Sequence, residues 1–222
     1  MNLITPVIWN YELSWGITPE PYLCTYKPSN VSISDKIEMK VRKEAAIGWY
    51  RDKDWNLHQV MTDYTGGFLI SKEPFLYGKF SFKCNLPSWR GAWPAVWLID
   101  TSGKMGIPPE IDIMESMQKN CLSRNKSTCS YHDLPDAPGK YSKEFVKSVR
   151  HKEGDHCFEL IWDPGMLRFY ADNSCTMVVT KDQVKRFPDL PMNLIVDLTI
   201  GDWGTKDHEE TFVIKELEYE TI

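Results

Sequence analysis

Three carboxylates stand close together in an otherwise apolar stretch, residues 109–116 (PEIDIMES). Side chains of an extended strand alternate between its two faces, so Glu110 and Asp112 share one face and the two isoleucines share the other. Simple alternation would turn Glu115 toward the apolar face, where an unpaired carboxylate is costly. A one-residue bulge at Ile113 and Met114 would return Glu115 to the carboxylate face. The sequence therefore predicts a bulged strand with three acids on one face.

Two carboxyl groups that flank a scissile bond are the machinery of glycoside hydrolysis. The nucleophile must be ionised while its partner holds a proton, so the two pKa values must be driven apart. Three neighbouring acids do this by mutual repulsion, and their protons then belong to the coupled set. A solvated acidic strand is the alternative, but the apolar residues Ile111, Ile113 and Met114 argue against it.

The elements that must position these acids are strands almost throughout. Alternation of apolar and polar residues predicts strands at 31–33, 37–41, 77–85, 95–99, 111–115, 128–132, 156–162, 167–171, 176–179, 193–200 and 212–219. Residues 181–187 are expected to form one or two helical turns. Turns rich in Gly, Pro, Asn and Asp separate the strands, which indicates an all-β fold, an antiparallel β-sandwich. A single domain over residues 1–222 is expected, because sandwiches of this length often remain undivided.

In two of these strands, one face carries polar or tryptophan side chains and the other face is aliphatic. Trp93, Ala95 and Trp97 share one face, opposite Val96 and Leu98. In residues 193–200 the aliphatic face is formed by Leu194, Val196, Leu198 and Ile200, and the reverse face by Asn193, Asp197 and Thr199. A concave sheet with a lined groove would account for both patterns, since indole rings suit stacking on sugars.

Composition and charge exclude some classes of binding partner. The net charge of −5 and the scattered Lys and Arg argue against nucleic acid. No apolar run has the length of a membrane-spanning helix, so no membrane partner is expected, and the chain is expected to be a monomer. Residues 1–6 lack the basic and apolar regions of a signal peptide. The protein is therefore expected to be secreted if a leader has been removed, and cytoplasmic otherwise.

The six cysteines form no CxxC pair, so no metal site is predicted from them. Cys84 and Cys157 lie in strand-like runs and could be buried thiols. Cys121 and Cys129 bracket a polar loop and are the most plausible disulfide pair.

Several motifs together resemble the family-16 glycoside hydrolases. Residues 110–115 match the family's ExDxxE signature, and residues 91–97 (GAWPAVW) are similar to its GxWPAFW segment. Other similar segments follow in the family's order: NVSISD at 30–35, FLYGKF at 75–80, NLP at 85–87, FELIW at 158–162, RFY at 168–170, and residues 194–203. The resemblance extends from about residue 28 to the C-terminus.

This resemblance implies a concanavalin-like β-jelly-roll with a substrate cleft across its concave sheet. It also implies hydrolysis with retention of anomeric configuration, in which Glu110 is the nucleophile, Glu115 the general acid/base, and Asp112 tunes the pair. No cofactor is required for that mechanism. A structural calcium ion on the convex face occurs in many family members, although no ligand set for it is evident in the sequence.

Six further residues are implied to bind substrate. Trp93 and Trp97 would stack on sugar rings near the cleaved bond, and His132 would contact sugar there. Trp203 would form another wall of the cleft, Asn30 would contact a glycone sugar, and Asp197 stands where the family often has Asn. The remaining histidines, His58, His151, His156 and His208, are interpreted as surface or packing residues.

The substrate is expected to be a β-1,3- or mixed β-1,3-1,4-glucan, cleaved internally by a laminarinase-like endo-β-1,3(4)-glucanase. The bulged signature is shared with agarases, porphyranases and carrageenases, so a galactanase of the same fold is the alternative, and a non-catalytic glucan-binding protein a more distant one. A transglycosylase is a further alternative, and it would differ only in that an acceptor sugar outcompetes water for the glycosyl-enzyme. Phe68 replaces an Arg of the laminarinase-like pattern, which removes a five-donor group from the expected cleft.

Overall fold

The structure is a computed structural model that describes residues 2, 9–12, 24–52, 54, 56–87, 89–100, 109–118, 125–133, 143–201 and 209–222. The strands in the first half of the chain are β1 (Trp9–Asn10), β2 (Cys24–Tyr26), β3 (Val31–Ile33), β4 (Ile37–Val41), β5 (Ala46–Arg51), β6 (Leu57–Thr62), β7 (Tyr64–Ser71), β8 (Gly78–Asn85), β9 (Ala92–Ile99) and β10 (Glu110–Glu115). Those in the second half are β11 (Lys126–Asp133), β12 (Lys143–Arg150), β13 (Asp155–Trp162), β14 (Met166–Ala171), β15 (Ser174–Thr180), β16 (Asn193–Ile200) and β17 (Glu210–Glu220). Two 3₁₀ turns, η1 (Pro28–Asn30) and η2 (Lys181–Gln183), complete the described elements.

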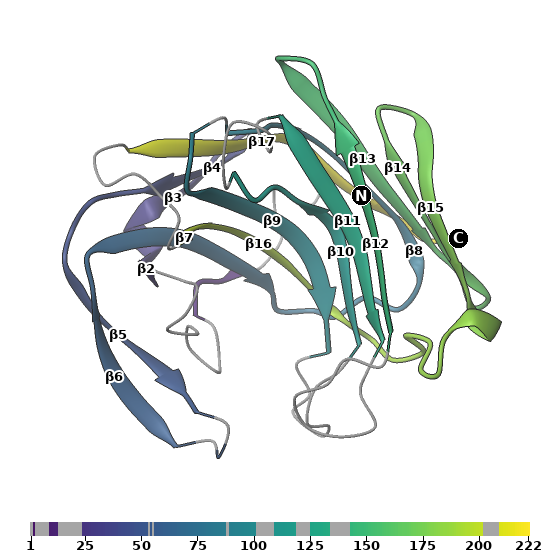
Figure 1. Cartoon of the computed structure of the whole chain (residues 1–222), viewed down its shortest axis with the longest axis horizontal. Helices are drawn as coiled ribbons and strands as arrows, with labels where there is room; N and C mark the ends of the chain where they lie inside the picture. Colours follow the sequence, from purple (N-terminus) through teal and green to yellow (C-terminus); the bar gives the residue numbers. More distant parts are fainter. Residues whose placement is uncertain are drawn as a thin grey trace.

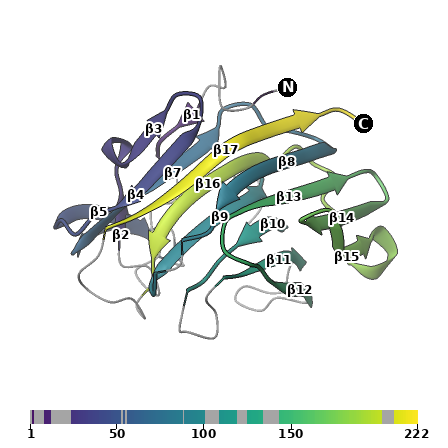
Figure 2. The same cartoon turned by 90° about the horizontal axis from the view of Figure 1, so that it is seen from above.

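Two large sheets pack face to face. The eight-stranded sheet has the order β1-β7-β16-β9-β10-β11-β12, with β2 also paired to β7, and the seven-stranded sheet has the order β15-β14-β13-β8-β17-β4-β3. In Figure 1 the eight-stranded sheet is strongly curved, and its concave face is turned away from the other sheet. Figure 2 shows β17, β8 and β13 lying over β16, β9 and β10. The predicted β-sandwich is confirmed.

One pairing departs from the predicted antiparallel pattern. β2 runs parallel to β7, in the register Cys24↔Tyr64. β1 pairs antiparallel with the other end of the same strand, through Trp9↔Ser71. Two short segments thus share the edge of β7.

The core between the sheets follows the predicted alternation. β8 buries every second residue, among them Phe80, Phe82 and Cys84, and β13 meets it with Phe158 and Leu160. Val96 and Leu98 of β9 and the aliphatic face of β16 close the core from the other sheet. Each fully buried aliphatic or aromatic side chain contributes roughly 1.5–3 kcal/mol of transfer free energy.

Six strands had no counterpart in the sequence prediction, for physical reasons. β7 is buried on both faces along its whole length, so it has no period of two. β12 lies at an edge of its sheet and exposes Val146, Lys147 and Ser148 in succession. β5 and β6 form a separate two-stranded sheet whose apolar residues Ile47 and Met61 are exposed. β1 and β2 are two and three residues long.

The predicted Cys121–Cys129 disulfide is wrong. Cys129 is a free thiol whose Sγ lies 3.5 Å from Thr176 Oγ1, while Cys121 lies outside the described residues. Cys129 alternates into the core with Tyr131 instead. Within the part of the chain that the structure describes, no helix is both long and apolar enough to span a membrane.

Candidate active site

The predicted bulge is present in β10. Against β9, Asp112 pairs with Trp97 and Met114 with Val96, so Ile113 is the extra residue. Against β11, Asp112 pairs with Ser130 and Glu115 with Thr128, so Ile113 and Met114 together oppose one residue. The bulge thus lets both Ile113 and Met114 face the core.

Burial separates the two faces of β10. Ile111, Ile113 and Met114 are at most 2% exposed and belong to the core between the sheets. Glu110 and Glu115 are half-buried, and Asp112 is buried. The three acids therefore lie on the concave side of the eight-stranded sheet, over an apolar layer.

His132 of β11 joins this group of acids. It is the register partner of Glu110, and its Nε2 lies 2.8 Å from Asp112 Oδ2 and 4.0 Å from Glu110 Oε1. Burial raises the pKa of Glu110 well above its ordinary value, the charges of Asp112 and Glu115 raise it further, and His132 acts in the opposite direction. The hydrogen bond with Asp112 also raises the pKa of Glu110.

The two tryptophans of β9 donate hydrogen bonds to carboxylates. Trp93 Nε1 donates to Glu115 Oε1 over 2.6 Å, and Trp97 Nε1 donates to Asp197 Oδ2 over 2.8 Å. Their indole N–H groups thus position acids, a role that the alternation pattern did not reveal. Both rings remain half-buried, and stacking on sugar stays a prediction for them.

Asp197 forms a fourth carboxylate of the same face. It lies in β16 opposite Ala95, which is also the register partner of Glu115. The small alanine therefore separates two acids on neighbouring strands. Burial raises the pKa of Asp197 to about 7, the hydrogen bond from Trp97 lowers it, and the charges of Glu115 and Asp112 raise it.

The structure changes the interpretation of Asn30 and Phe68. Asn30 is 2% exposed, and its Nδ2 donates to Thr65 Oγ1 over 2.7 Å and to the Gly66 carbonyl over 3.2 Å. The amide thus holds η1 against β7, and the direct sugar contact stays a prediction. Phe68 is 1% exposed and packs on Tyr26, with ring centroids 5.0 Å apart. Trp203 lies outside the described residues.

Two groups of metal-ligating atoms occur among the described residues. One is Glu110, Asp112 and His132, and the other is His151, His156 and Asp172. Both include histidine nitrogen, whereas Ca²⁺ takes six to eight oxygen ligands. Neither group fits the calcium ion that the family resemblance implies.

A β-sandwich whose concave sheet carries a coupled set of carboxylates, with indole N–H groups aimed at them, has the architecture of a carbohydrate-active protein. Comparison with protein families specifies the class. The family model of glycosyl hydrolases family 16 matches residues 19–216, so the chain belongs to this family.

Individual relatives agree with this assignment. The chain is 26% identical over 194 residues to endo-1,3-1,4-beta-glycanase EglC of Rhizobium meliloti (strain 1021), a match that covers 86% of this chain and 38% of that protein. It is 28% identical over 225 residues to the beta-glucanase of Rhodothermus marinus, with 91% of this chain and 73% of that protein covered. The laminarinase catalytic domain from Thermotoga maritima MSB8 has the same fold, with a TM-score of 0.78, 24% identity, and coverage of 99% of this chain and 93% of that chain.

Proposed function

We propose that this chain hydrolyses a β-1,3- or mixed β-1,3-1,4-glucan with retention of anomeric configuration. The observation that carries this proposal is the bulged strand β10, which sets Glu110, Asp112 and Glu115 on one face beside His132. The relatives' names give the substrate class, since two of them are called glucanase or 1,3-1,4-glycanase.

In the proposed reaction, the Glu110 carboxylate attacks the anomeric carbon while Glu115 gives its proton to the leaving glycosidic oxygen. This step forms a glycosyl-enzyme ester at Glu110. Glu115, now ionised, removes a proton from water, whose oxygen displaces Glu110 and restores the starting state. No metal or other cofactor is needed for either step.

Asp112 connects the carboxyl group of Glu110 with the ring of His132. Burial and the neighbouring charges raise the pKa of Glu110, whereas attack on the anomeric carbon requires its ionised form. Asp112 is hydrogen-bonded to both Glu110 and His132, so it holds the Glu110 carboxyl in place. The Trp93 N–H then holds the Glu115 carboxyl in place throughout.

The charge of the site favours a neutral glucan over a sulfated galactan. Four carboxylates, Glu110, Asp112, Glu115 and Asp197, gather on the concave face, and His132 contacts Asp112 and Glu110. A sulfate group placed among these acids would be repelled. A galactanase of the same fold is the alternative that the experiment must separate.

The test is a polysaccharide panel with product sizing. Laminarin, barley β-glucan and agarose are incubated with wild type, Glu110→Gln and Glu218→Gln, the last a matched change at an exposed residue of β17. We expect oligosaccharides from laminarin or β-glucan, a loss of about 10⁴-fold or more in Glu110→Gln, and unchanged turnover in Glu218→Gln. Release from agarose alone would overturn the substrate, and full turnover by Glu110→Gln would overturn the mechanism.

A further inference from the structure

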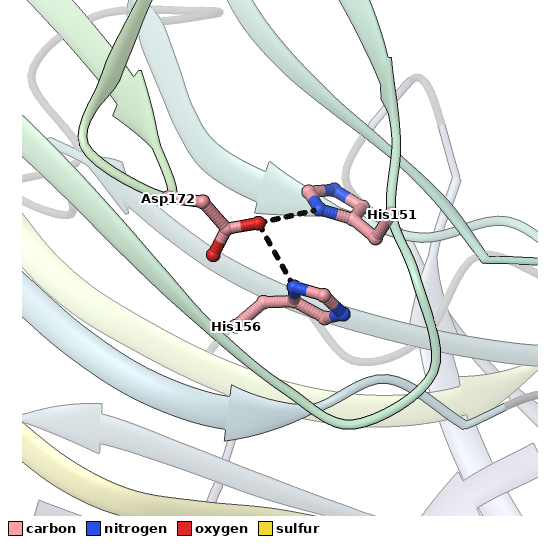
Figure 3. A group of neighbouring side chains, drawn as sticks. All are labelled: His151, His156 and Asp172. Carbon is pink, nitrogen blue, oxygen red and sulfur yellow. Dashed lines mark hydrogen bonds and ion pairs between the residues drawn. The ribbon is translucent and has the colours of Figure 1, made fainter.

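Two histidines and one aspartate point toward one another in a group outside the concave face (Figure 3). His151 directly follows β12, His156 lies in β13, and Asp172 begins the turn between β14 and β15. Asp172 Oδ2 lies 3.3 Å from His151 Nδ1 and 2.9 Å from His156 Nδ1. Both rings are buried, whereas the Asp172 side chain is 48% exposed.

This cluster lies on the opposite side of the sheet from the β10 acids. It contacts β11 through Ser127, whose Oγ lies 2.7 Å from His151 Nε2. In β11, Ser127 alternates toward the interior with Cys129 and Tyr131, whereas His132 faces the carboxylates. The reaction proposed above therefore does not use these three residues.

Local hydrogen bonds hold the cluster in place. Asp172 adopts a φ of 47° in a tight turn. Its N–H donates to the Cys157 carbonyl over 2.8 Å, and the Cys157 N–H donates back to Asp172 Oδ1 over 3.0 Å. The other carboxylate oxygen is left to face the two rings. Ligands fixed in this way by their surroundings are characteristic of metal sites.

The hydrogen-bond partners assign the state of His156. Its Nε2 lies 2.9 Å from the Lys152 carbonyl oxygen, which can only accept, so Nε2 carries a hydrogen. In the neutral ring, Nδ1 then presents a lone pair to the Asp172 carboxylate, 2.9 Å away. Two acceptors at this distance repel each other unless a positive species joins them. That species is either a second proton on His156 or a cation bound to both residues.

The spacing fits a cation. Zn²⁺ with four ligands at about 2.0–2.1 Å in tetrahedral geometry keeps neighbouring ligand atoms about 3.3 Å apart. The two nitrogen–oxygen distances here are 3.3 and 2.9 Å, and the ligand atoms of all three residues lie within 4.8 Å of one another.

We propose that His151, His156 and Asp172 bind a transition-metal cation such as Zn²⁺, with water at the exposed fourth position. Two imidazole nitrogens select zinc, cobalt or nickel over Ca²⁺. The bound ion joins the end of β12, in the eight-stranded sheet, to β13 and β14 of the seven-stranded sheet. Its role is to stabilise the fold, since a ligand that binds only the folded state raises the melting temperature.

The test is metal uptake by the whole chain after treatment with chelator. Calorimetric titration with ZnCl₂ and the visible spectrum of bound Co²⁺ are recorded for wild type, His156→Gln and Asp172→Asn. We expect one ion per wild-type chain, a four-coordinate Co²⁺ spectrum, and an affinity lowered by more than about 100-fold in each variant. Asp172→Asn changes a half-exposed residue, so it keeps the test usable if His156→Gln fails to fold.

Two controls isolate the site. His58→Gln removes an exposed histidine whose Nε2 lies 2.7 Å from Asp52 Oδ2, a pair that belongs to neither group of potential ligands among the described residues. Glu110→Gln disrupts the other group of potential ligands. Both should bind metal as wild type does. The proposal is overturned if wild type takes up no stoichiometric metal, if both site variants bind normally, or if Glu110→Gln abolishes uptake.

Discussion

At the scale of single residues, the indole nitrogens of Trp93 and Trp97 have a role separate from that of their rings. Each donates to a carboxylate of the concave face, Trp93 to Glu115 and Trp97 to Asp197. A hydrogen bond from a fixed donor both orients a carboxyl group and favours its ionised form. We therefore expect these tryptophans to orient the acids of the proposed reaction, in addition to the sugar stacking predicted for their rings.

Trp93→Phe tests this role, because phenylalanine keeps a ring for stacking and lacks the N–H. Without the hydrogen bond, Glu115 stays protonated to higher pH, so the alkaline limb of the pH–rate profile should move upward. We expect kcat to fall about tenfold through lost orientation, with KM little changed. Trp97→Phe is the matched control, because the Trp97 N–H donates to Asp197. This variant should leave the alkaline limb unchanged. An unchanged profile in Trp93→Phe would contradict the assigned role.

Asp197→Asn tests the buried fourth acid through the pH dependence of stability. Between an unfolded pKa near 3.8 and the folded pKa of about 7, the folded protein holds a proton that the unfolded chain has lost. Asp197 therefore contributes stability that is full below pH 3.8 and declines by about 1.4 kcal/mol per pH unit up to about pH 7. The Asn variant lacks this decline. The difference in free energy of unfolding between the variant and wild type should therefore shift in favour of the variant as the pH rises from about 3.8 to about 7.

Urea denaturation at several pH values from 4 to 8 measures this difference. Asp182→Asn, at an exposed residue of η2, is the control and should parallel wild type. A constant difference between Asp197→Asn and wild type at every pH would show that Asp197 ionises as freely in the folded chain as in the unfolded one.

At the scale of elements, the bulge in β10 is the feature that unites the core with the site. It allows Ile113 and Met114 to enter the core in succession while Glu115 returns to the concave face. The conflict between acid spacing and strand alternation was visible in the sequence, which is why the bulge could be predicted at the correct residues.

Deleting Met114 should test this interpretation. The shortened run would alternate regularly, with all three acids still on the concave face, because the bulge and its extra residue disappear together. We expect a folded protein with reduced but measurable hydrolysis. Exchanging Ile111 and Asp112 keeps the composition but places a carboxylate in the core, which should cost several kcal/mol and abolish activity. Circular dichroism melting and the same product assay compare the two. Equal behaviour of deletion and exchange would rule out the bulge as the determinant.

The amphipathic strands were predictable, and the site was predictable in part. β3, β4 and β16 begin and end where alternation predicted, because every second residue of each strand is apolar and packs in or against the core between the sheets. β7, buried on both faces, and β12, at an exposed edge, carry no such pattern. The same limit applies to Asn30, whose burial depends on β7 packing against η1.

At the scale of the whole molecule, the two faces of the eight-stranded sheet have separate tasks. One face packs on the seven-stranded sheet, and the other carries the acids of β10 and β16. The histidine cluster joins the end of β12, in the eight-stranded sheet, to β13 and the turn after β14, in the seven-stranded sheet. Pairings between strands distant in sequence, such as Glu115–Ala95–Asp197, arise only from this assembly, so no local pattern reveals them.

The central claim is that the acids of β10 hydrolyse β-glucan through a covalent intermediate. The most direct measurement is the anomeric configuration of the first product, followed by ¹H NMR from the start of hydrolysis of laminarin or barley β-glucan. Two displacements at one carbon predict that the β-anomer appears first and then mutarotates, and that Glu110→Gln releases no product. Initial release of the α-anomer would contradict the account.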